Sequence, residues 1–195
     1  MILKKPQMAL VLPWIYFKET YGFKMDLSRY IRDVPDFPVK GVIFKDITPL
    51  LANSEALQET INLIISNYDF SGIDIIAGIE SRGFILAAPI AYKMNKPLVL
   101  FRKSDKLPYK TKSASYDLEY GSNTIEIHED SIKENDRILL IDDLIATGGT
   151  LGACVDLINQ FEAHIHGIAV IIELNFLHGR DMLKDIDLFS IISYS

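Results

Sequence analysis

Cysteine is almost absent from this sequence: Cys154 is the only one among 195 residues. No internal disulfide can form, and a reducing, cytoplasmic compartment is expected. Histidine is also scarce, with four residues. His164 and His166 would share one face of a strand, but no third ligand lies near them in the sequence. A solvent-facing strand start is therefore favoured over a metal pair, and no structural zinc site is predicted.

Basic charge and long hydrophobic runs are missing as well. Twenty Lys and Arg stand against 26 Asp and Glu, a net charge of −6. A nucleic-acid binder usually carries a basic surface, so no nucleic-acid partner is expected and any phosphate should be held locally. The apolar run Met8–Phe17 is interrupted by Pro13 and is about half of the ~20 residues that a membrane helix needs. No membrane partner is expected.

What is present suits one folded domain. A hydrophobic fraction of 49% and a charged fraction of 24% exclude a disordered chain, which lacks the apolar residues to build a core. A new helix-starting pattern begins at Met25. We therefore expect residues 1–24 to be a leader, non-native or dispensable, and residues 25–195 to form a single domain.

Hydrophobic periodicity predicts strands that alternate with helices. Helices are expected at Leu27–Arg32, Ser54–Tyr68, Phe84–Met94, Thr150–Phe161 and Arg180–Lys184, and strands at Ile73–Ile79, Pro97–Phe101, Thr124–His128 (exposed), Arg137–Ile141, Gly167–Leu174 and Phe189–Ser193. This order predicts an α/β fold with a mainly parallel central sheet flanked by helices. Ligands of such sheets bind beyond the carboxyl ends of the strands, so chemistry is expected after Ile79, Phe101 and Ile141.

The loop after Ile141 begins with Asp142 and Asp143 and continues into a turn of small residues, Ala146–Thr150. The turn can direct backbone N–H groups, two hydroxyls and a helix N-terminus at one phosphate. Gly148 and Gly149 let the backbone approach closely. The two aspartates would repel a phosphate, so they are expected to bind the vicinal hydroxyls of a ribose. No lysine follows the glycines, which excludes a P-loop.

The loop after Ile79 reads Glu80-Ser81-Arg82-Gly83. Backbone donors, a hydroxyl and a guanidinium at a helix start suit a pyrophosphate. A surface cation beside a solvated acid is the plainer alternative.

A basic stretch, Arg102–Tyr120, has no apolar period and contains Arg102, Lys103, Lys106, Lys110 and Lys112. Long irregular stretches in compact domains are often lids. We expect a mobile loop that closes over the pyrophosphate and excludes water, with a solvated loop as the alternative.

Together these segments resemble the type I phosphoribosyltransferase family, and within it the adenine-specific enzymes. Besides the string from Asp142 to Thr150, the resemblance rests on Phe37-Pro38-x-x-Gly41-x-x-Phe44-Lys45-Asp46-Ile47-Thr48-Pro49, Glu80-Ser81-Arg82-Gly83-Phe84, Arg102-Lys103-x-x-Lys106-Leu107-Pro108 and Tyr116-Asp117-Leu118-Glu119-Tyr120-Gly121. These motifs occur in the family order from Met25 onward. The resemblance implies transfer of the 5-phosphoribosyl group from phosphoribosyl pyrophosphate to adenine, giving AMP and pyrophosphate, as in purine salvage. It also implies Mg²⁺ as cofactor, a homodimer, a small hood and a mobile lid loop.

The resemblance also assigns roles to residues. Phosphoribosyl pyrophosphate would be bound by Glu80, Ser81, Arg82, Arg102, Lys103, Lys106, Tyr120, Asp142, Asp143, Ala146, Thr147, Gly148, Gly149 and Thr150. Adenine would stack on Phe44, near Ile79, with the backbone of Ile43 and Lys45 reading its edge. Catalysis would fall to Glu119, Asp142, Asp143 and Arg82, with Glu119 managing the proton at N7 of the purine. Mg²⁺ would bridge the pyrophosphate and the ribose hydroxyls, with no direct protein ligand predicted.

The resemblance also bears on the backbone at two positions. It implies that the peptide bond between Glu80 and Ser81 is cis, as is common in the family. Asp105 stands where the family often has glycine, which puts the geometry of that turn in question.

Two alternatives stay open. One is a transferase for a 6-oxopurine, although such a site usually needs a donor to O6. The other is a non-enzymatic sensor of phosphoribosyl pyrophosphate. Such proteins usually add a DNA-binding domain, which 24 residues are too few to form.

Overall fold

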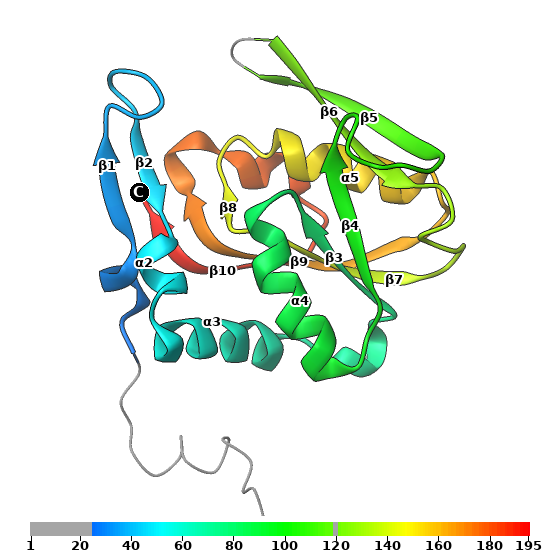
Figure 1. Cartoon of the computed structure of the whole chain (residues 1–195), viewed down its shortest axis with the longest axis horizontal. Coiled ribbons are helices and arrows are strands. Elements are labelled where there is room, and N and C mark those ends of the chain that lie inside the picture. The colour runs from blue at the N-terminus through cyan, green and yellow to red at the C-terminus, as the bar shows by residue number, and fades with distance from the viewer. Residues whose placement is uncertain (1–24, 119–120) are drawn as a thin grey trace, which may run out of the picture.

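An eight-stranded sheet forms the centre of the computed structural model, which describes residues 25–118 and 121–195 (Figure 1). The strands are β1 Arg32–Pro35, β2 Ile43–Asp46, β3 Ile75–Ile79, β4 Leu98–Lys103, β5 Thr111–Leu118, β6 Gly121–His128, β7 Arg137–Ile141, β8 Leu144–Ile145, β9 His164–Leu174 and β10 Leu188–Tyr194. Their order in the central sheet is β10-β9-β7-β3-β4-β6-β5, with β8 beside β9. From β10 to β4 the pairs are parallel, and β4–β6 and β6–β5 are antiparallel. The predicted mainly parallel sheet is confirmed.

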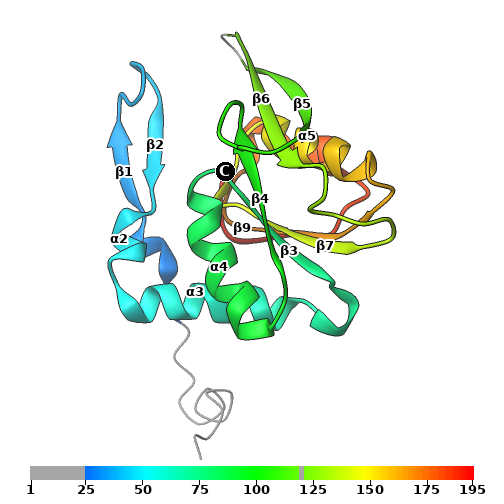
Figure 2. The same ribbon diagram turned by 45° about the vertical axis from the view of Figure 1, so that its right-hand side comes forward.

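Helices cover both faces of this sheet (Figures 1 and 2). The helical segments are η1 Leu27–Tyr30, α2 Thr48–Leu51, α3 Ser54–Asn67, η2 Phe70–Gly72, α4 Arg82–Met94, α5 Gly149–Asn159, η3 Asn175–Leu177 and η4 Gly179–Leu183. Successive strand residues face opposite sides, so Ile76 packs in the core with Leu86 of α4, whereas Ala77 packs in the core with Leu157 of α5. None of the described helices is both long and apolar enough to cross a bilayer.

A separate two-stranded ribbon, β1–β2, stands beside the main sheet and forms the expected hood (Figure 2). Its strands pair antiparallel and are joined by the proline-rich segment that contains the cis Phe37–Pro38 bond. Asp36 accepts a hydrogen bond from the N–H of Gly41 at 2.7 Å, which closes the turn. The two strands were not predicted, because each has four mostly exposed or half-buried residues and no clear apolar alternation.

The prediction of one long loop from Arg102 to Tyr120 is wrong. Strand β4 continues to Lys103, and β5 runs antiparallel to β6 along its whole length. Two side chains of β5, Ala114 and Tyr116, pack on the core beside α5. They alternate with polar residues, a weak period of two that hydropathy alone misses.

Two further expectations about this region are settled. Strand β6 is not fully exposed, because Ile125 and Ile127 are buried. In the turn between β4 and β5, Asp105 has a φ of 63°. This left-handed conformation suits glycine best but is tolerated by aspartate. The turn therefore keeps the shape that the family's glycine would allow.

A forked ion pair joins the starts of the neighbouring strands β3 and β7. Asp74 accepts hydrogen bonds from the backbone N–H and from Nε of Arg137, both at 2.9 Å, and from a terminal nitrogen at 3.1 Å. These bonds, the side-chain ones first, lower the pKa of Asp74 to about 2.

We expect Asp74→Asn to lose stability in a pH-dependent way. Because the folded-state pKa lies below the unfolded value, the charged carboxylate stabilises the fold above about pH 4 and loses this contribution as pH falls toward 2. Urea unfolding from neutral pH downward should show the gap between parent and variant closing with acidity. Asp130→Asn, at an exposed position, is the control; a gap that does not change with pH would refute the assignment.

Candidate active site

A cavity of about 440 Å³ opens at the carboxyl ends of the central parallel strands. Of the described residues, it is lined by Phe44, Glu80, Ser81, Arg82, Lys103, Tyr116, Asn123, Ile125 and the continuous segment 142–151. The predicted loops after Ile79 and Ile141 thus meet here, as strand topology requires. The strand that contains Phe101 contributes Lys103.

The turn after β8 presents an anion site to this cavity. Helix α5 begins at Gly149, and its N-cap, Gly148, has a φ of 86° and no side-chain cap. The first N–H groups of a helix lack partners within the helix, and the helix dipole adds positive potential there. No acidic side chain lies in the first turn, and Thr147 and Thr150 line the cavity beside it. This end of the cavity can hold a phosphate.

The acid pair lies between the phosphate turn and the loop after β3. Asp143 is only 5% exposed, and its Oδ2 lies 2.9 Å from Nε of Arg82. Burial raises the pKa of Asp143, and Arg82 opposes that rise. Burial and the charge of Asp143 raise the pKa of Asp142 well above its ordinary value. Arg82, which is expected to bind the pyrophosphate, thus forms an ion pair with Asp143, which is expected to bind the ribose.

Main-chain contact holds these two loops together. A Cβ on Gly83 would lie 2.6 Å from the carbonyl oxygen of Ile141. The start of α4 therefore packs directly on the end of β7, and a larger residue would separate Arg82 from Asp143.

The loop after β3 also contacts the basic strand beside it. The Glu80–Ser81 peptide is cis, as the resemblance implied. Glu80 accepts hydrogen bonds from Nε of Arg102 at 3.2 Å and from the N–H of Lys103 at 3.0 Å. Neither Arg102 nor Lys106 lines the cavity, because Arg102 is hydrogen-bonded to Glu80 and Lys106 is exposed. Their expected role in binding the pyrophosphate stays a prediction.

The hood brings one aromatic ring to the cavity. Phe44 lines it, with the guanidinium carbon of Arg82 5.1 Å from the ring centroid. Lys45 turns away: its Nζ lies 2.7 Å from Asp33 and 3.8 Å from the centroid of the Tyr194 ring. The hood therefore contacts the last strand of the main sheet as well as the site.

The other residues expected at the base site do not belong to the cavity lining. Ile79 is fully buried in the core beneath the sheet edge, because it lies on the face covered by α5. Ile43 and Lys45 are not part of the cavity lining either, and their expected role, reading the edge of the base through their backbone, stays a prediction. An aliphatic residue that the sequence analysis missed, Leu144, does line it. Its place directly after the acid pair was the signal that could have found it.

Two more lining residues, Tyr116 and Asn123, were not predicted. Tyr116 lies in β5, which was expected to be a loop, and Asn123 lies in β6, which was expected to begin only at Thr124. They form one cross-strand pair of β5 and β6.

The expected roles of Glu119 and Tyr120, and the leader at residues 1–24, lie outside the described residues.

The donor set at the cavity suits a hard cation that is shared with a ligand. No group of three or more His, Cys, Asp or Glu residues that could hold a metal occurs among the described residues. The carboxylates Asp142 and Asp143 nevertheless supply oxygen atoms, the donors Mg²⁺ prefers, and Mg²⁺ commonly takes its other ligands from water and substrate phosphates.

Comparison with known proteins agrees with this geometry. The family model of the phosphoribosyl transferase domain matches residues 47–193. An adenine phosphoribosyltransferase of Halothermothrix orenii is 49% identical over 168 residues, which cover 86% of this chain and 99% of that protein. The chain belongs to the adenine phosphoribosyltransferase family.

Solved structures of the adenine phosphoribosyltransferase family share the fold. The enzyme of Thermoanaerobacter pseudethanolicus superposes with a TM-score of 0.82 at 40% identity, covering 87% of this chain and 98% of that one. The Saccharomyces cerevisiae enzyme, complexed with an imino-altritol bisphosphate and adenine, gives 0.82 at 33% identity, covering 86% and 97%. The resemblance stated from the motifs is confirmed.

We expect Arg82→Met to destabilise the fold by about 1–3 kcal/mol at neutral pH, because it leaves the buried Asp143 carboxylate without its partner. The loss should grow as pH rises, since the pKa of Asp143 rises further without Arg82.

The double variant Arg82→Met/Asp143→Asn carries no buried charge at this pair and should recover much of the loss. Denaturant unfolding of the two single variants and the double variant measures the coupling. Simple additivity of the two changes would contradict a direct pair.

Proposed function

We propose that this chain transfers the 5-phosphoribosyl group of phosphoribosyl pyrophosphate to adenine, releasing AMP and pyrophosphate. The observation that carries the proposal is the set of groups that line one cavity. These are an uncapped helix start, an acid pair with an arginine on one of its members, an aromatic ring beside that arginine, and an aliphatic side chain. A phosphate, a ribose, a pyrophosphate and a flat base need groups of these kinds.

At the phosphate end, the turn at Ala146–Thr150 is proposed to hold the 5′-phosphate. Its backbone N–H groups are already oriented, so little reorganisation is needed when the charge arrives. Asp142 is proposed to accept hydrogen bonds from the ribose hydroxyls. Fixing the ribose at both ends positions its C1 atom, and positioning of this kind contributes much of the rate in transfer reactions.

The leaving pyrophosphate is proposed to lie along Ser81 and Lys103, next to Arg82. As the C1–oxygen bond breaks, the ribose gains positive character and the pyrophosphate carries away the electron pair. Lys103 and the N–H groups at the start of α4 favour that negative charge. Mg²⁺, where bound to the pyrophosphate through its oxygens, would neutralise part of the leaving charge.

The base is proposed to stack on Phe44 with Leu144 as the apolar neighbour. Stacking on an aromatic ring is worth about 1–3 kcal/mol per base. The role expected of Glu119, accepting the proton released as N9 of adenine forms its new bond, completes the reaction as a proposal. A cytoplasmic homodimer is part of the same proposal; exposed Ile85, Tyr92 and Leu98 offer apolar surface for a partner copy.

The first test is pyrophosphate release with phosphoribosyl pyrophosphate and Mg²⁺, comparing adenine, hypoxanthine, guanine and xanthine at equal concentration. We expect release with adenine alone. Release with a 6-oxopurine would keep the phosphate site and overturn the proposed base site. Tight binding of phosphoribosyl pyrophosphate without release would favour a sensor.

A second prediction isolates the base site. Phe44→Ala should raise the KM for adenine by about tenfold or more, because a stacking surface is lost. The KM for phosphoribosyl pyrophosphate should change little. Steady-state kinetics with Phe176→Ala, an exposed phenylalanine away from the cavity, is the matched control. Equal rises in both KM values for Phe44→Ala would mean that Phe44 only stabilises the hood.

A further inference from the structure

A buried glycine supports the phosphate turn from behind. Gly179 is buried although residues 175–178 and Arg180 are exposed. A Cβ on Gly179 would collide with the carbonyl oxygen of Ala146 and lie 2.9 Å from the N atom of Gly148. Conversely, a Cβ on Gly148 would lie 2.5 Å from the carbonyl oxygen of Gly179. The two segments are therefore in direct main-chain contact.

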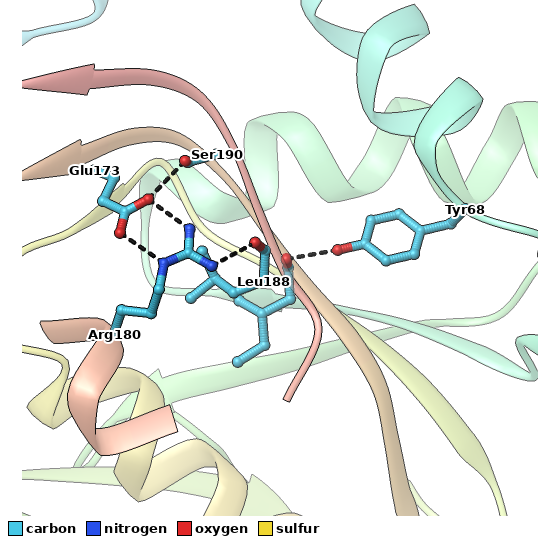
Figure 3. Close-up of polar contacts among 6 residues, drawn as sticks. Tyr68, Glu173, Arg180, Leu188 and Ser190 are labelled. Atoms are coloured by element: carbon cyan, nitrogen blue, oxygen red, sulfur yellow. Dashed lines mark hydrogen bonds and ion pairs between the residues drawn. The ribbon is translucent and has the colours of Figure 1, made fainter. Parts of the chain in front are cut away.

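The residue after this glycine is held by a fork of charge-assisted hydrogen bonds (Figure 3). Arg180 donates from Nε and a terminal nitrogen to the two carboxylate oxygens of Glu173, at 2.8 and 2.6 Å. Its other terminal nitrogen donates to the carbonyl of Leu188 at 2.8 Å. Ser190 donates to Glu173 at 2.6 Å. Bidentate arginine–carboxylate pairs of this kind fix orientation as well as distance.

The same glutamate lies beside the strand that leads into the phosphate turn. Glu173 pairs with Ile145 where strands β8 and β9 lie side by side, and Ile145 directly precedes Ala146. Three contacts therefore link the segment 173–180 to the phosphate turn. The side chain of Glu173 binds that of Arg180, the main chain of Gly179 packs on the turn, and Ile145, just before the turn, pairs with Glu173 in the sheet. On the other side, Tyr68 donates to the carbonyl of Ile168 at 2.7 Å and fixes the same strand (Figure 3).

We propose that Gly179 and Arg180 are positioning residues for the phosphate turn, holding its N–H groups in the shape that binds the 5′-phosphate of phosphoribosyl pyrophosphate. This inference rests on the proposed function, but it predicts binding of a simple sugar phosphate without turnover. Neither residue touches the cavity, so their effect passes through the turn and not through contact with substrate.

The test measures ribose 5-phosphate binding by titration calorimetry, together with KM values for both substrates. Gly179→Ala should raise the Kd for ribose 5-phosphate by about tenfold or more, as expected for the loss of a hydrogen bond to a charged phosphate. The KM for phosphoribosyl pyrophosphate should rise with it, and the KM for adenine should stay nearly unchanged. Gly152→Ala is the matched control, because its Cβ would meet only Met182 at 3.7 Å.

If Gly179→Ala does not fold, the variants Arg180→Met and Arg180→Lys test the positioning role instead. The methionine variant should weaken ribose 5-phosphate binding, and lysine, which keeps the charge but not the fork, should restore part of it. Equal losses for ribose 5-phosphate and adenine, or an unchanged Kd in folded variants, would overturn the positioning role. A parent protein that releases pyrophosphate with adenine but does not bind ribose 5-phosphate would overturn this inference alone, whereas a parent without pyrophosphate release would overturn the proposed function.

Discussion

Main chain packs directly on main chain where the loops after β3, β7 and β9 meet, and the shape of the site depends on this contact. Gly83 lies against the end of β7, and Gly148 lies against Gly179. A side chain at any of these positions would separate the loops, because the opposing atoms are backbone and cannot move aside like a flexible side chain. The phosphate turn, the acid pair and Arg82 are brought to one cavity by these close approaches.

The contact creates an electrostatic problem that Arg82 partly solves. A buried and a half-buried carboxylate stand next to a turn suited to an anion, in a chain that is acidic overall. Pairing Asp143 with Arg82 opposes the rise in its pKa and limits repulsion toward the phosphate side. The close ion pair of Arg82 is with Asp143, which leaves the oxygen atoms of Asp142 to accept hydrogen bonds from hydroxyls.

The Phe44 side of the cavity is built differently from the side formed by the turn at Ala146–Thr150. The phosphate turn belongs to the main sheet and is held by its ladder, whereas Phe44 belongs to a separate two-stranded ribbon. The ribbon reaches the rest of the molecule through Phe44 beside Arg82 and through Lys45 over the Tyr194 ring. Changes in the hood can therefore affect the Phe44 side of the cavity without disturbing the main-chain contacts at Gly83 and Gly148.

Local sequence determined the strand–turn–helix units, because the apolar period of Arg137–Ile141, the aspartates after it and the small turn residues act within one segment. It therefore predicted the α/β sheet correctly, and it placed the turn at Ala146–Thr150 directly before helix α5, where the structure has it. Tertiary structure decided what depends on partners distant in sequence: the engagement of Arg82 by Asp143, the burial of Ile79, and the pairing of β5 with β6. Short polar strands have no local signal strong enough to reveal their partner. The contact of Gly179 with the turn after β8 likewise exists only because the sheet brings β8 and the end of β9 side by side.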